Sequence, residues 1–149
     1  MTISCEAALP GDSILAGCVS PGDFVDCYAS RTDLDAASVA RRLVDFPAWV
    51  GWLMALRNLL VAPFGLKTVH QAGDRIGIFP VAQRATNEIL LGFNDWHLNF
   101  RLSVIRRNDL AYAATWVRTH NLVGRTYLWI IMPFHRLIIR NAMKRVSGA

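Results

Sequence analysis

The chain has few cysteines, and their positions exclude the common cysteine-based sites. It contains three, Cys5, Cys18 and Cys27, all within the first 27 of its 149 residues. They form neither a CxxC pair nor a Cys/His ligand spacing, and an odd number cannot pair completely in disulfides. We therefore expect reduced thiols and a cytoplasmic protein.

The sequence also lacks the local motifs of most enzymes that use a metal or a nucleotide. The four histidines, His70, His97, His120 and His135, show neither HxH nor HExxH spacing. No GxSxG, P-loop or GxGxxG motif is present, so serine-hydrolase, nucleotide and dinucleotide chemistry lack their usual signals. We expect no bound metal and no cofactor.

Long hydrophobic runs are absent as well. The longest late stretch without a charge, Thr126–Phe134, has nine residues, about half of the ~20 that a membrane-spanning helix needs. Leu15–Cys18 is similar to a lipoprotein cleavage box, but such a signal needs a basic start, and the first basic residue is Arg31. The sequence predicts no transmembrane helix.

Acidic residues are missing from the C-terminal part of the chain. Residues 110–149 hold six basic residues and no acid, whereas residues 1–40 hold six acids and one arginine. The simplest explanation is a final helix whose last turns carry cations that complement its dipole. Contact with an anionic membrane surface through Arg136, Arg140 and Lys144 is an alternative. Aromatic residues are not interleaved with these cations, so we expect no nucleic-acid partner.

Hydrophobic residues make up 53% of the chain and charged residues 18%, with a formal net charge of +5. A chain of 149 residues with this composition is long enough for one hydrophobic core and too short for two. No repeat or linker divides the sequence. We predict an irregular lead-in over residues 1–22 and a single domain over residues 23–149, present as a monomer or a homodimer.

The first elements after the lead-in change from strand to helix periodicity. Asp23–Ser30 alternates in the manner of a strand. From Asp35 apolar residues recur at helical spacing, with Thr32, Asp33 or Asp35 available as the N-cap. A second helix is predicted from Pro47 to Leu60, and its apolar stripe is Trp49, Trp52, Leu53, Leu56 and Leu60.

The next part of the chain predicts an antiparallel meander of four strands: Asp74–Val81, Glu88–Asn94, Leu98–Arg106 and Leu110–His120. A two-residue Asn108–Asp109 turn would pair the last two strands so that opposed residue numbers sum to 217. One face then carries Leu98, Phe100, Leu102 and Val104 opposite Thr119, Val117, Thr115 and Ala113. The other carries His97, Asn99, Arg101 and Ser103 opposite His120, Arg118, Trp116 and Ala114.

A final helix is predicted from the N-cap Asn121 to about Val146, with a kink at Pro133. Its apolar stripe contains His135, and Arg136, Arg140 and Lys144 form an opposite, solvated ridge. Short strand connections exclude parallel crossovers, so the fold class is α+β. We expect the last helix to lie across a curved antiparallel sheet and to leave a cavity beneath it.

Four separated segments resemble a bacterial family catalogued only as a domain of unknown function: DRIGIFPV at 74–81, HLNFRLSV at 97–104, VRTHN at 117–121 and PFHRLIIR at 133–140. Such proteins are similar to the START-like superfamily, which includes polyketide cyclases and the birch-pollen allergen and has a helix-grip fold. The resemblance implies a cavity for an apolar small molecule. It also places an Asp where this chain has Asn99 and a charged residue where it has Trp96, so a cross-strand acid facing Arg118 would be missing here.

One cluster of four polar residues and one separate histidine are candidates for function. His97, Arg101, Arg118 and His120 could form a cluster in which His97 and His120 move protons and Arg118 stabilises an oxyanion; alternatively they form the water-facing side of the sheet. His135, inside an apolar stripe, is either a hydrogen-bonded core histidine or the polar anchor of a ligand.

The leading hypothesis is a domain that binds an apolar or amphipathic small molecule between the sheet and the last helix. The expected ligand-binding residues are Trp52, Phe100, Leu102, Val117, Leu128, Ile131 and His135. A cofactor-free cyclase or isomerase, with His97, His120 or His135 as the base, is the alternative from a different class.

Overall fold

A seven-stranded sheet carries the fold, and all of its neighbouring strands are antiparallel. The computed structural model describes residues 5–45, 48–49, 51–52, 55–56, 74–76 and 79–147. In spatial order the strands are β1 (Cys5–Glu6), β2 (Phe24–Arg31), β7 (Leu110–Thr119), β6 (Leu98–Arg107), β5 (Glu88–Asn94), β4 (Phe79–Arg84) and β3 (Arg75–Ile76).

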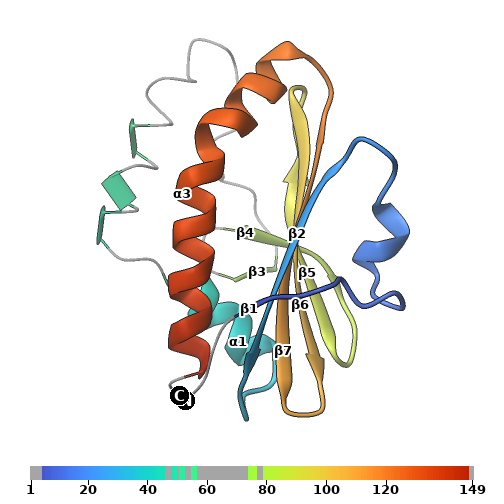
Figure 1. Ribbon diagram of the computed structural model, residues 1–149, viewed down its shortest axis with the longest axis vertical. Helices are drawn as coiled ribbons and strands as arrows, with labels where there is room; N and C mark the ends of the chain where they lie inside the picture. Colours follow the sequence, from blue (N-terminus) through green and yellow to red (C-terminus); the bar gives the residue numbers. More distant parts are fainter. Residues whose placement is uncertain are drawn as a thin grey trace.

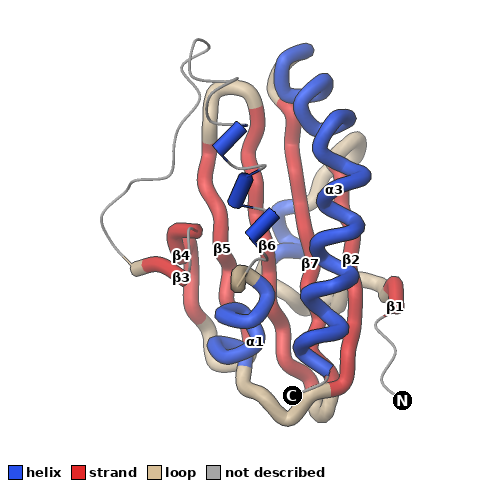
Figure 2. Tube along the Cα trace, turned by 90° about the vertical axis from the view of Figure 1, so that its left-hand side faces the viewer, coloured by secondary structure: helices blue, strands red, loops and turns tan. Residues whose placement is uncertain are grey.

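Helices lie on both faces of this sheet. The long helix α3 (Leu122–Ser147) and the short helix α1 (Ala36–Leu43) lie on the inner face, and the 3-10 helix η1 (Leu15–Cys18) lies on the outer face (Figures 1 and 2). The described residues 48–49, 51–52 and 55–56 are on the same side as α1 and α3. The predicted α+β class, with a C-terminal helix held against a curved antiparallel sheet, is confirmed.

The β6–β7 hairpin has the predicted register at every paired position, from Leu98 opposite Thr119 to Arg107 opposite Leu110. Asn108 has a φ of 53°, a left-handed conformation that asparagine tolerates better than most residues and that a two-residue hairpin turn requires. The turn fixes the register, and the register decides which side chains face α3.

Both helices begin at the caps that the sequence indicated. The Asp35 carboxylate accepts the backbone N–H of Ser38 at 3.1 Å, and the Asn121 side-chain oxygen accepts that of Gly124 at 3.0 Å. Pro133 lies inside α3, where it cannot donate to the preceding turn. The first turns of the helix are inclined to the rest in Figure 1, as the predicted kink requires.

The main core fills the space between the inner face of the sheet, α1 and the C-terminal half of α3. On α3 the buried residues are Ile139, Ala142, Met143 and Val146, and on α1 they are Ala36, Val39, Ala40 and Leu43. Sheet residues from β2, β5, β6 and β7 complete it, among them Tyr28, Leu91, Leu102 and Val104. The C-terminal half of α3 is therefore fixed by packing, whereas its N-terminal half is more exposed.

The outer face of the sheet is covered by the N-terminal segment. Leu15 is fully buried against Cys27, Leu90, Ala114 and Trp116. The predicted lead-in thus contains a short strand and a 3-10 helix that contact the sheet. The expectation that this face is simply the water-facing side is wrong, because a segment distant in sequence supplies a second apolar layer.

Two further predictions concern the part of the chain between residues 47 and 81. The single strand predicted over Asp74–Val81 is wrong: β3 pairs antiparallel with β4, so that Ile76 lies opposite Phe79. The second helix predicted over Pro47–Leu60 falls largely outside the described residues. Within it Trp49, Trp52 and Leu56 are exposed, contrary to the predicted core stripe.

Candidate functional site

A cleft of about 590 Å³ opens between the N-terminal half of α3 and the loop that precedes β2. The wall formed by α3 carries three apolar residues and Arg125, and the opposite wall includes Asp23 and Thr119. The lining residues are Pro21, Gly22, Asp23, Thr119, Arg125, Leu128, Trp129 and Met132. The cleft lies beside the N-terminal half of α3, on the side that faces β2. It is therefore at one end of the interface between sheet and helix where a cavity was predicted.

The loop wall of the cleft is shaped by a tight turn. Gly22 has a φ of +88°, which side-chain-bearing residues rarely adopt. The Asp23 backbone N–H donates to the Ser20 carbonyl at 3.1 Å, and the Asp23 carboxylate accepts the Ser20 N–H at 2.9 Å. These reciprocal bonds close the turn and aim the carboxylate towards β7.

Asp23 holds the side chain of Arg118. Its two oxygens accept from Arg118 Nε and Nη2 at 3.1 and 2.9 Å, and Trp116 Nε1 donates to it at 2.9 Å. The bonds from Arg118 lower the pKa of Asp23 to about 2. Arg118 Nη2 also donates to the Cys18 carbonyl and to Ser20 Oγ. The guanidinium predicted to stabilise an oxyanion is thus bound within the protein on the outer side of the sheet.

His135 lies one helical turn beyond Met132 and pairs with a strand residue. Its Nε2 is 3.0 Å from Asp26 Oδ2 on β2, and both side chains are less than one-fifth exposed. Phe24 meets the imidazole edge-on, with ring centroids 6.4 Å apart. A histidine oriented by a carboxylate and lying along the same side of α3 as the cleft is a group that could move a proton.

His97 is buried, not water-facing as one interpretation of the sequence expected. Its side chain is 1% exposed and packs edge-on against Tyr127 of α3, with centroids 5.4 Å apart. Its Nδ1 is 3.8 Å from a carboxylate oxygen of Asp95, which is also buried. His97 follows β5 and precedes β6, so strand alternation does not govern where its side chain points.

His120 has different neighbours from His97. The His120 backbone N–H donates to the His97 carbonyl, but its imidazole Nε2 lies 3.0 Å from Asn99 Oδ1 at an exposed position. Of the predicted cluster, His97 packs against Tyr127 of α3, Arg118 is bound to Asp23, and His120 contacts Asn99, the residue paired with Arg118. Arg101, the fourth polar residue, donates to the Phe100 carbonyl at 2.7 Å.

The predicted ligand-binding residues occupy several places. Leu128 lines the cleft, and Ile131 is half-buried on the same helix. Phe100, Leu102 and Val117 are on the inner face of the sheet, where Phe100 packs against Phe79 and Phe93. Trp52 is 80% exposed. Leu128 is thus the one of these residues that the structure puts in the cleft.

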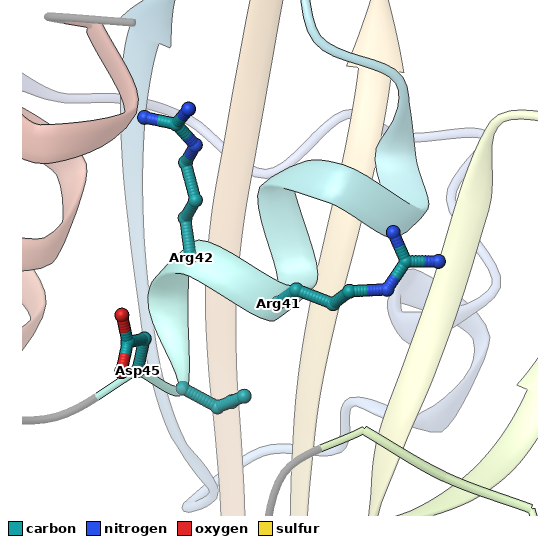
Figure 3. Close-up of a pocket in the computed structure, with 4 residues that line it drawn as sticks. Arg41, Arg42 and Asp45 are labelled. Atoms are coloured by element: carbon teal, nitrogen blue, oxygen red, sulfur yellow. The ribbon is translucent and has the colours of Figure 1, made fainter.

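A second hollow of about 410 Å³ lies at the C-terminal end of α1. It is lined by Arg41, Arg42, Val44 and Asp45, and in Figure 3 the two guanidinium groups point in different directions. Arg145 Nη2 donates to the Asp45 carbonyl at 3.0 Å. Of the four residues that line this hollow, only Val44 is apolar.

Two kinds of site are not seen in the described part of the chain. There, no group of three or more His, Cys, Asp or Glu side chains converges as metal ligands would. Likewise, none of the helices described combines the length and apolar character required to cross a bilayer.

Sequence reasoning missed Asp23, Asp26 and Arg125. Asp26 did carry a signal: in the alternating run Phe24–Tyr28 it shares a face with two aromatic residues, and His135 is likewise a polar residue in an apolar stripe. One polar side chain on each of two packed apolar surfaces indicates a pair. Asp23 and Arg125 follow no periodic pattern and are placed by the loop and by the helix cap.

Comparison with known proteins gave one match. The model of a family described as "Protein of unknown function (DUF2867)" matches residues 19–142, which include every described element from β2 to β7 and most of α3. Neither a curated protein nor a solved structure matches the chain.

Proposed function

Taking as premise that the chain belongs to the DUF2867 family, we propose that it binds an amphipathic small molecule in the cleft between α3 and the loop before β2. The observation that carries the proposal is the composition of the cleft walls. Leu128, Trp129 and Met132 offer an apolar surface, and Arg125 and Thr119 stand beside it. Ligand sites commonly combine an apolar lining with a few polar groups that fix orientation.

The charges of the cleft favour an anionic head group. The Asp23 carboxylate is occupied by Arg118, Trp116 and the Ser20 N–H. Among the described residues no carboxylate pairs with the Arg125 guanidinium, so this cation is available to a ligand. The ligand would place a carboxylate or sulfonate at Arg125 and its apolar body along Leu128 and Met132.

This proposal agrees with the START-like resemblance, which also implies an apolar cavity beside a C-terminal helix. The order of elements, with the helix α1 between the first long strand and the meander and a long C-terminal helix, supports that resemblance. Membership of the START-like superfamily, a cytoplasmic location and a monomeric or homodimeric state belong to the same proposal. No cofactor is invoked.

Binding is testable with 8-anilinonaphthalene-1-sulfonate, a fluorescent probe that has an apolar body and one anionic group. We expect saturable fluorescence enhancement by the folded protein, weakened about tenfold in Arg125→Gln because a charge-assisted contact of about 1.5–3 kcal/mol is lost. Leu128→Ser should weaken it similarly. Arg31→Gln, which removes an equal charge at the far end of β2, should leave it unchanged. Equal binding by all variants would refute the cleft as the site.

The Asp26–His135 pair favours a second function, cofactor-free proton transfer on the bound molecule. The Asp26 carboxylate, 3.0 Å from His135 Nε2, orients the imidazole. Native mass spectrometry of protein purified from its host would identify a bound molecule, whose conversion is then followed. We expect His135→Gln to retain the molecule and to lose conversion by at least 100-fold. Unchanged conversion would exclude this role.

A further inference from the structure

The side of α3 that faces away from the sheet is not uniformly polar. Ile130, Phe134 and Leu137 are 54%, 43% and 51% exposed, and Trp129 is 78% exposed. Ile130, Phe134 and Leu137 are spaced by four and three residues, so they form one strip along the helix. The sequence predicted a cationic ridge on the side opposite the core, with contact to an anionic membrane surface as one alternative, but it did not predict this apolar strip.

The cations of α3 border this strip. Arg136, Arg140 and Lys144 are all exposed and recur every four residues. Leu137 is three residues before Arg140 and seven before Lys144, which places the ridge directly beside the apolar strip. We call the two together the outer face of α3.

No acidic residue balances these cations on the helix, and residues 110–149 contain none. Each salt bridge of the described residues lies elsewhere, on the sheet, its loops or the inner side of α3. The outer face of α3 therefore combines exposed apolar side chains with cations that form no salt bridge among the described residues.

We propose that the outer face of α3 docks on an anionic lipid surface, with the strip inserted at the headgroup–acyl boundary and the ridge among the headgroups. Helices that lie in a membrane interface share this composition: Trp, Phe and aliphatic residues beside Lys and Arg. The helix would lie parallel to the surface, held by the core packing of its C-terminal half on the sheet. The inference is independent of the ligand cleft, although Trp129 borders both.

Charge complementarity favours lipid over the other possible occupants. A second copy would bring the same cationic ridge against the first, so that like charges would face each other across a two-fold interface. A nucleic acid would satisfy the cations, but its phosphates would leave the aliphatic strip unpaired with any apolar surface. Anionic lipid is the partner that offers both negative charge and an apolar layer.

Sedimentation with phosphatidylcholine vesicles, with and without added phosphatidylserine, tests the proposal on the full chain. We expect binding to the phosphatidylserine vesicles only, and loss of binding as salt is raised from about 0.1 M to 1 M, where the screening length falls to about 3 Å. The triple variant Arg136→Gln, Arg140→Gln, Lys144→Gln should bind roughly 100-fold more weakly, at about fivefold for each cation.

A matched control removes three charges from the sheet instead. Arg31→Gln, Arg84→Gln and Arg107→Gln change the net charge equally at positions outside α3 and should retain binding within about threefold. Ile130→Ser with Leu137→Ser should lose about tenfold without lowering the thermal midpoint appreciably, because both side chains are half exposed.

Several outcomes would overturn the proposal. They are absence of binding to phosphatidylserine vesicles, equal losses in the two triple variants, or a dimer in light scattering that Ile130→Ser with Leu137→Ser dissociates. Retention by an oligonucleotide without retention by vesicles would assign the face to nucleic acid.

Discussion

The carboxylate of Asp23 binds the guanidinium of Arg118 through both of its oxygens, and so joins the loop before β2 to the end of β7. In the β2–β7 register Phe24 lies opposite Val117, so Asp23 follows as the residue opposite Arg118. On its other side Arg118 pairs with Asn99 of β6. The family resemblance implies an acid at position 99 facing Arg118; in this chain the acid that binds Arg118 is Asp23, from the loop before β2.

Asp23 predicts a specific acid sensitivity. The pKa of its carboxyl is lowered to about 2 from an ordinary value of 3.8. Because the folded pKa is the lower one, the stabilisation is complete above about pH 4 and is lost as the pH falls towards 2. Urea unfolding at about pH 5 and about pH 3 should show a smaller difference in Asp23→Asn than in the parent. An exposed acid, Asp33, serves as the Asp33→Asn control, and an equal effect of the two substitutions would contradict this assignment.

Gly124 is required where α3 crosses the turn between β5 and β6. A Cβ at this position would overlap the carbonyl oxygen of His97, which is backbone and cannot move aside freely. We expect Gly124→Ala to lower the free energy of unfolding by about 1–3 kcal/mol in urea denaturation, as overpacked sites do. Gly17→Ala, with open space around the added Cβ, should change it by less than about 0.5 kcal/mol. Equal values for the two variants would refute the close approach.

Glu88 is a buried carboxylate that fastens the N-terminal segment to the outer face. It accepts hydrogen bonds from the Ile14 N–H at 2.7 Å and from Ser103 Oγ at 2.6 Å. Glu88→Gln puts an amide donor beside one of these donors, and we expect a loss of about 1–3 kcal/mol in urea unfolding. Hydrogen exchange should also accelerate at residues 14–18 more than in β6. Unchanged exchange there would show that apolar contacts alone hold the segment.

The two described free cysteines should differ in reactivity. Burial, with a smaller contribution from the nearby Asp26 charge, raises the pKa of Cys27 to about 12, whereas Cys18 is partly exposed. In a Cys5→Ser background, we expect a thiol reagent to label one cysteine in the native protein and two in urea. Mass spectrometry of the labelled peptides should identify Cys18 as the native site, and native labelling of Cys27 would contradict its burial.

The sequence predicted the parts of the fold that depend on local signals. The Asn108–Asp109 turn and the alternation of the strands beside it were sufficient for the β6–β7 register. Asp35 and Asn121 were sufficient for the two helix starts, because capping needs only residues within one turn.

Features that depend on distant segments were not predictable in this way. The outer face is covered because Leu15 packs on residues some 75–100 positions further along the chain, such as Leu90 and Ala114. No hydrophobic periodicity predicts a contact of this kind. The same reason explains the site: His97 is buried by Tyr127, and Arg118 is bound by Asp23. The sequence identified each of these two side chains as a candidate site residue, but it did not predict which residue each one contacts.

In the described part of the chain, the two outermost strands of the sheet, β1 and β3, span two residues each. Because a strand this short presents few unsatisfied backbone amides and carbonyls, it is a poor template for a strand from another molecule. Within the described residues, addition of a strand from another molecule to β1 or β3 is therefore disfavoured.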